Sequence, residues 1–71
     1  MSEIIVAPMP GKVIKILVNV GDQVKEDDEI MILEAMKMEN SIFCTATGPI
    51  QEIRIKEGDS VNTDQALFVL G

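Results

Sequence analysis

The chain of 71 residues contains no histidine, no tryptophan and no tyrosine. Without histidine, neither a histidine general base nor a histidine metal site can form. A Gly-rich phosphate loop is also missing from the sequence. The sequence therefore predicts no catalytic residues and no metal ligands, and the chain is not expected to be an enzyme by itself.

Basic residues are scarce: six lysines and arginines stand against twelve acidic residues, which gives a net charge of −6. Nucleic-acid binding requires clustered basic residues, commonly with aromatic rings that stack on bases. The six basic residues here are scattered, so no nucleic-acid partner is expected. An acidic surface keeps a protein in solution and can orient it towards basic partners.

Cys44 is the only cysteine, so an intrachain disulfide is excluded and the side chain is expected to be a small buried hydrophobe. No apolar run approaches the ~20 residues of a membrane span. The N-terminal residues Met1, Ser2 and Glu3 do not resemble a signal peptide. We therefore expect a cytoplasmic chain that does not insert into a membrane.

The acidic run Glu26–Glu29 is the one candidate cation site in the sequence. It lacks the spaced ligands and the central glycine of a calcium loop. The run is therefore interpreted as a solvated turn.

The sequence repeats itself after a shift of 37 residues. Residues 11–33 align with residues 48–70 without a gap, with seven identities in 23 positions. The identical pairs are Gly11 and Gly48, Ile16 and Ile53, Gly21 and Gly58, Asp22 and Asp59, Val24 and Val61, Asp27 and Asp64, and Leu33 and Leu70. Each half is too small to bury its own apolar face, so the repeat predicts two similar units that share one core.

Short runs rich in valine and isoleucine between glycines and aspartates predict β-structure in both halves. Residues 12–18 are expected to form a strand with Ile14, Ile16 and Val18 on one face. Residues 50–55 are expected to form the equivalent strand of the second half, with Ile53 and Ile55 on one face and Glu52 and Arg54 on the other. Further strands are expected at 30–33 and 67–70. Turns are predicted at Gly21-Asp22 and Gly58-Asp59, and Asp27 and Asp64 suit left-handed turn positions.

The segment 34–39 lies between the apolar runs 30–33 and 42–43, which predicts a tight turn between two strands. Its residues are Glu34, Ala35, Met36, Lys37, Met38 and Glu39. The lysine amine would stand at the tip of this hairpin, and exposed methionines beside it would gain nothing in water. Their adaptable thioethers suit recognition by another protein, although packing against the end of the domain is the alternative.

These six residues resemble the biotin-attachment sequence of biotin-dependent carboxylases and decarboxylases. The Ala7-Pro8-Met9-Pro10-Gly11 segment and the paired Gly-Asp turns extend the resemblance to the biotinyl/lipoyl-carrier family over nearly the whole chain. The family often has glycine where Asp27 and Asp64 stand here. The gapless repeat leaves no room for the inserted thumb of some bacterial carriers, so the resemblance is to the thumbless subgroup.

The resemblance implies that residues 1–71 form one biotinyl domain, an all-β flattened β-barrel or barrel-sandwich hybrid. Such a fold has two four-stranded antiparallel sheets related by a pseudo-twofold axis, with the lysine hairpin and the termini at opposite ends. A free-standing carrier and an excised C-terminal domain are both compatible with the sequence.

The resemblance also implies a role as a biotin carboxyl carrier. A biotin protein ligase would join biotin to Lys37 as an amide, and the swinging arm would move carboxylate between active sites. Those sites would belong to biotin carboxylase and to carboxyltransferase or decarboxylase subunits. Met36 and Met38 would serve recognition. Ala35, Glu34 and Glu39 complete the motif, and the two glutamates either assist the ligase or only keep the hairpin soluble.

Two alternatives remain open at this point. A lipoyl-type carrier domain would have the same fold, but typically has Asp before its lysine and Ala or Val after it, whereas this chain has methionine on both sides. An unmodified barrel-sandwich interaction module would lack the lysine turn. The acceptor substrate, and whether the parent complex is a carboxylase, decarboxylase or transcarboxylase, do not follow from the sequence.

Overall fold

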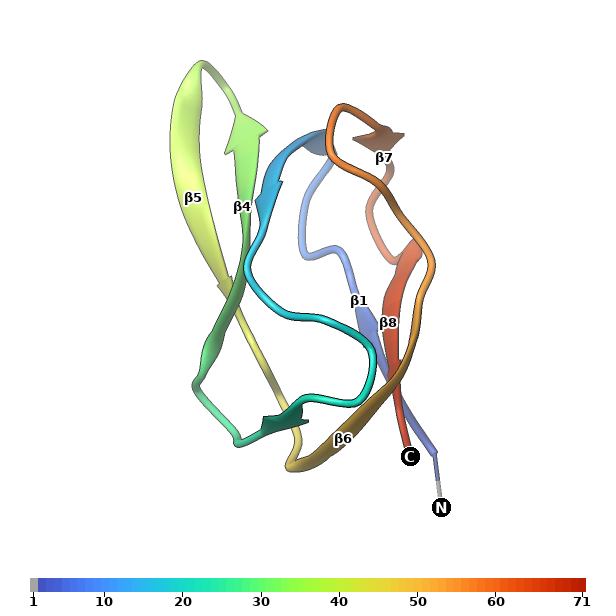
Figure 1. The fold of residues 1–71 in the computed structure, drawn as a ribbon. Coiled ribbons are helices and arrows are strands. Elements are labelled where there is room, and N and C mark those ends of the chain that lie inside the picture. Colours follow the sequence, from blue (N-terminus) through green and yellow to red (C-terminus); the bar gives the residue numbers. More distant parts are fainter. Residues whose placement is uncertain (1) are drawn as a thin grey trace.

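Eight β-strands form two four-stranded sheets in the computed structural model, which describes residues 2–71 (Figure 1). All strand pairs are antiparallel, and the sheet orders are β1-β8-β6-β3 and β5-β4-β2-β7. The strands are β1 (Glu3–Val6), β2 (Gly11–Ile16), β3 (Gln23–Val24), β4 (Glu29–Ala35), β5 (Met38–Phe43), β6 (Gly48–Ile53), β7 (Ser60–Val61) and β8 (Ala66–Leu70). The predicted all-β, two-sheet architecture is confirmed.

Met1 belongs to the N-terminal segment in which no signal peptide is expected, and it lies outside the described residues. Across residues 2–71, no helix has the length and apolar character that crossing a membrane requires.

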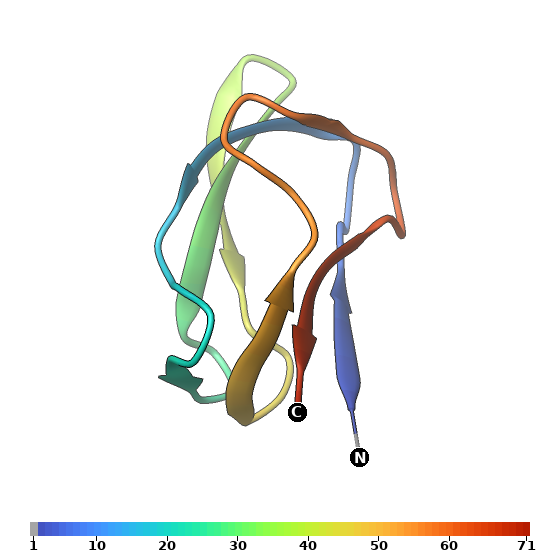
Figure 2. The same cartoon turned by 45° about the vertical axis from the view of Figure 1, so that its right-hand side comes forward.

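The pseudo-twofold symmetry predicted from the repeat is present and relates whole strands. A shift of 37 residues places β1, β2, β3 and β4 on β5, β6, β7 and β8, and it converts the order of one sheet into that of the other. Neither sheet belongs to one half, because β3 pairs with β6 and β7 pairs with β2. In Figure 2 the sheet containing β1, β8 and β6 faces the viewer, with β4 and β5 behind it. The halves therefore share both sheets as well as the core.

Four β-turns of one design, which we call the body turns, connect these strands. They span residues 19–22, 25–28, 56–59 and 62–65. In each, the fourth residue donates its backbone N–H to the first carbonyl, at 3.0–3.1 Å, and its side chain accepts the first N–H. The third residue has a positive φ in every case: Gly21 at 96°, Asp27 at 75°, Gly58 at 95° and Asp64 at 67°.

The body turns confirm three expectations from the sequence. Both Gly-Asp pairs are turns, and Asp27 and Asp64 adopt the left-handed conformation that aspartate tolerates better than most residues. Most of the acidic run Glu26–Glu29 lies in a turn, in which Lys25 donates its backbone N–H to the Asp28 carboxylate at 2.9 Å, and Glu29 begins β4.

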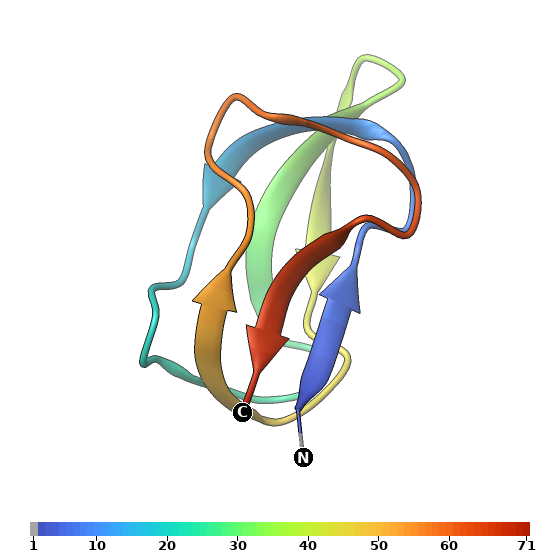
Figure 3. The same cartoon turned by 90° about the vertical axis from the view of Figure 1, so that its right-hand side faces the viewer.

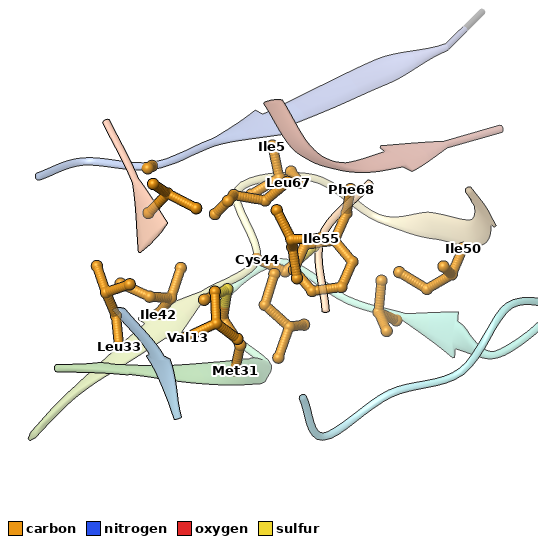
Figure 4. Close-up of a cluster of buried hydrophobic side chains, with 14 of the residues drawn as sticks. Ile5, Val13, Met31, Leu33, Ile42, Cys44, Ile50, Ile55, Leu67 and Phe68 are labelled. Carbon is orange, nitrogen blue, oxygen red and sulfur yellow. The ribbon is translucent and has the colours of Figure 1, made fainter. Parts of the chain in front are cut away.

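The core lies between the two sheets and is almost entirely aliphatic (Figure 4). The two apolar runs supply its centre: Ile30, Met31 and Leu33 of β4 and Leu67 and Phe68 of β8 are fully buried. Cys44 is buried as expected, and its thiol donates to the Ala46 carbonyl at 2.9 Å.

One predicted strand face is wrong. Ile14 is 36% exposed, and its neighbour Val13 is only 1% exposed. The register of β2 against β4 shifts between Val13 and Lys15, and this bulge breaks the strict alternation that was assumed. Because of the bulge, Ile14 does not share the more buried face of Ile16.

The corresponding expectation for the second half is correct. Ile55 is buried and Ile53 is partly buried, although β6 ends at Ile53. Glu52 and Arg54 lie on the exposed side, where the Arg54 Nε donates to the Glu52 carboxylate at 3.0 Å. Exposed ion pairs of this kind contribute little to stability.

The two ends of the molecule differ in what they carry (Figures 1 and 3). The hairpin between β4 and β5 projects at one end. The N- and C-terminal strands meet at the other, where Glu3 pairs with Leu70. The domain measures 34 × 17 × 17 Å, so it is an elongated body with the lysine turn at one end.

Candidate functional site

The lysine turn is a two-residue β-hairpin loop. Ala35 and Met38 form the last pair of β4 and β5, which leaves Met36 and Lys37 as the loop residues. Both have positive φ, 54° and 64°, as a type I′ turn requires. Asparagine and glycine are the usual residues at such positions because a larger side chain is strained there. The turn thus places two unusual side chains in a tightly defined geometry.

The side chains of this turn extend into solvent. Met36 is 93% exposed, Met38 is 66% exposed, and Lys37 between them is also exposed. The only ion pair within residues 2–71 is that of Arg54 with Glu52, so the Lys37 amine is not held by a carboxylate of the described chain. An exposed primary amine at the rigid end of a sheet can be acylated by an enzyme that reaches it.

The other motif residues have different surroundings. Ala35 is only 6% exposed, so its side chain anchors the base of the hairpin and offers little to a partner. Glu34 and Glu39 are exposed and lie directly opposite each other across β4 and β5. Like charges in this arrangement are mildly destabilising, and Lys12, opposite Glu34 on β2, offsets this repulsion. The structure brings all six motif residues together at one end of the sheet.

Two residues that support the site were not among its predicted members. A side chain at Gly11 would overlap the Glu34 carbonyl oxygen and press on Leu33, so glycine lets β2 pack closely beneath the hairpin. Asn40 donates its side-chain amide to the Met38 carbonyl at 3.1 Å and fixes the backbone beside the turn. Asparagine is uncommon in strands, so Asn40 could have been recognised from the sequence as a residue with a special role beside the turn.

The fold and the projecting hairpin define a class of protein: a barrel-sandwich domain with an exposed lysine on a hairpin at one end. The model of the family described as "Biotin-requiring enzyme" matches residues 3–70. The chain belongs to this family.

Individual relatives agree with this assignment. The biotin carboxyl carrier protein of Streptococcus mutans is 48% identical over 64 residues, which are 90% of this chain and 49% of that protein. The biotin carboxyl carrier protein of acetyl-CoA carboxylase from Solanum lycopersicum is 42% identical over 66 residues, 93% of this chain and 94% of its own. The chain therefore spans about half the length of the first relative and nearly all of the second.

A solved structure shows the same fold within a much larger enzyme. The urea carboxylase of Kluyveromyces lactis superposes with a TM-score of 0.92 and 31% identity over the whole of this chain, which is 6% of that enzyme. The predicted membership of the biotin/lipoyl-attachment family is thus confirmed.

Proposed function

We propose that Lys37 is the residue to which biotin is attached. The chain is a biotin carboxyl carrier domain, since carriers of this kind match most of its length at 42–48% identity. One observation supports Lys37 above all others: it is the exposed lysine of a two-residue turn, held by a six-residue strand on one side and a seven-residue strand on the other. The domain does not catalyse a reaction alone, because its part is to present the cofactor.

The residues of this chain would hold and orient the biotin arm. The Lys37 amine forms the amide, and the strained turn sets the direction in which the side chain leaves the domain. Gly11 and Asn40 fix the backbone beneath it. When attached, biotin supplies the ring that carries carboxylate, while the protein supplies position and a high effective concentration at each active site.

Two kinds of partner follow from this role. The carrier works with carboxylase components, as its relatives are parts of biotin-dependent carboxylases. A biotin protein ligase is the second proposed partner, because formation of the amide requires activation of the biotin carboxylate, and the chain has no catalytic residues for that step. Met36 and Met38 are the proposed recognition residues on either side of the lysine.

Intact-mass measurement on protein isolated from cells that contain biotin ligase tests this proposal. We expect the mass of one biotin amide on the wild-type chain and none on the Lys37→Arg variant. Peptide mapping should place the addition at Lys37. The addition of lipoate, or an unmodified chain in cells that biotinylate other carriers, would contradict the proposal.

A further inference from the structure

The two sides of the sandwich protect their sheet edges differently. On one side the edge strands are β3 and β7, with two residues each. Very short edge strands are one way in which proteins avoid unwanted strand pairing. On the other side the edge strands are β1, with four residues, and β5, with six, and neither contains lysine or proline. This side therefore has longer edges, and each edge strand has a single glutamate as its only charged residue.

A groove of about 370 Å³ lies between these two longer edges. Its walls include Val6 of β1 and Phe43 of β5, which are 41% and 53% exposed and occupy equivalent positions in the repeat. Pro8 and Met9 extend the apolar wall, and Asn40 and Ser41 supply polar groups. Its exposed apolar walls and adjoining strand edges make it suitable for an extended apolar segment of another protein.

Charge and position favour one kind of occupant for this groove. The strands β1 and β5 carry Glu3 and Glu39 and no basic residue, so the segment that fits would be flanked by lysine or arginine. The groove also begins close to the lysine turn: Asn40 is three residues from Lys37, about 10 Å along a strand.

The length of the lysine side chain favours the loading enzyme over the carboxylase. An unmodified lysine places its amine only about 6 Å from the Cα atom, so the enzyme that acylates it must approach the body of the domain closely. The attached arm adds roughly 8 Å, so an active site that uses carried biotin can remain further from the groove. Contact with the groove is thus a stronger requirement for loading than for carboxyl transfer.

We propose that the groove between β1 and β5 is the docking surface for the biotin protein ligase, and that it receives an extended apolar segment of the ligase flanked by basic residues. This inference rests on the proposed loading of Lys37. It assigns the ligase a second contact, on the body of the domain, in addition to the methionines of the turn.

Steady-state biotinylation of the intact chain by a purified biotin protein ligase tests the inference. The test variant is Val6→Thr with Phe43→Thr, which removes the apolar walls and keeps residues that favour strands. The control is Leu17→Thr with Val20→Thr, which removes two comparably exposed apolar side chains, at 38% and 62%, from the connection between β2 and β3.

We expect KM for the test variant to rise about tenfold with kcat nearly unchanged, because a docking contact contributes equally to the ground state and the transition state. The control should stay within about twofold of the wild type. Thermal melting establishes that each variant is folded, and the single change Phe43→Thr against Val20→Thr replaces the pair if the double variant fails to fold. An unchanged KM in the folded test variant overturns the inference.

The other outcomes separate the inference from the proposed function. A wild-type chain that the ligase does not label at all overturns both. Normal loading of the test variant, followed by slow carboxyl transfer from its biotin, would assign the groove to the carboxylase and overturn the inference alone. A third outcome is that the test variant is loaded normally, and that the wild type forms a dimer in sedimentation whereas the test variant does not. This outcome would assign the groove to a second copy of the chain and would again overturn the inference alone.

Discussion

The body turns and the lysine turn place residues in the same left-handed conformation, but with different side chains. In the body turns the residue with positive φ is glycine or aspartate, and a side chain of the same turn accepts a backbone N–H. In the lysine turn two consecutive positions with positive φ hold Met36 and Lys37. A left-handed conformation costs such residues roughly 1–2 kcal/mol each relative to the right-handed form.

This difference is the one expected between turns that serve folding and a turn with the proposed functional role. Where only the path of the chain matters, the sequence uses residues that tolerate positive φ. In the lysine turn the sequence has Met and Lys despite the strain, which is the pattern expected if their side chains are presented to another protein, as proposed for Lys37. The surrounding strands hold the turn in place: β4 pairs on both sides, with β2 and β5.

The largest expected effect comes from moving the lysine by one position. The combined change Met36→Lys and Lys37→Met leaves composition and charge unaltered, and both positions keep positive φ. The two positions of a tight turn point in different directions, and a misplacement of about 1 Å can reduce a rate about 100-fold. We expect biotinylation to fall at least that far in a ligase assay read with streptavidin, with no label at Lys12, Lys15, Lys25 or Lys56. Efficient labelling of the moved lysine would show that exposure alone is sufficient.

The substitutions Gly11→Ala and Gly48→Ala together compare the two ends of the molecule. Gly11 packs under Glu34 at the hairpin end. Its repeat partner Gly48 packs against the Gly71 carbonyl at the terminal end, where an added Cβ would lie 2.9 Å from that oxygen. Overpacking typically costs 1–3 kcal/mol, so urea unfolding should show a loss of about 2 kcal/mol for Gly11→Ala. Gly48→Ala should also be destabilising, but only the change at Gly11 should slow biotinylation below the unfolding transition. Equal loading rates for the two folded variants would contradict a supporting role for Gly11.

Asp59→Ala removes the side-chain acceptor of one body turn. The Lys56 N–H then loses its bond of 2.9 Å, and we expect a loss of stability of about 1 kcal/mol, measured by thermal or urea unfolding. Asp22→Ala, the equivalent change in the other half, should cost a similar amount because the turns are built alike. A markedly larger loss in one half would show that the two turns are not energetically equivalent.

Met36→Gly tests the strain in the lysine turn directly. Glycine adopts positive φ without a steric penalty, although it loses more conformational entropy on folding. We expect stability to rise by about 0.5 kcal/mol, with slower biotinylation because a recognition side chain is lost. A loss of stability would indicate that the Met36 side chain packs against the domain, in conflict with its 93% exposure.

The smallest effect on stability is expected for Met36→Ala combined with Met38→Ala. Both side chains are exposed, and surface changes usually alter stability by less than about 0.5 kcal/mol. Differential scanning calorimetry should show a nearly unchanged melting temperature, whereas biotin loading or carboxyl transfer should slow. A large loss of stability with normal biotin chemistry would favour the packing role over the recognition role.

Much of this protein could be predicted from the sequence alone. The 37-residue repeat predicted the symmetry, because two copies of one pattern that cannot each bury a core must combine. The glycines and aspartates predicted the body turns, since few other residues accept positive φ. The motif around Lys37 predicted an exposed lysine on a hairpin, since it lies between two apolar runs. The roles of Met36, Met38, Glu34 and Glu39 stay predictions.

Only the tertiary structure decided features that depend on pairing between distant segments. The bulge that turns Val13 inward and leaves Ile14 exposed arises from the register of β2 against β4, which no local pattern specifies. The same is true of the close approach of Gly11 to Glu34. It is also true of the pairing of β3 with β6 and of β7 with β2, which joins strands of different halves. Local propensities set turns and strands one segment at a time, whereas register and sheet edges are determined by contacts made across the whole chain.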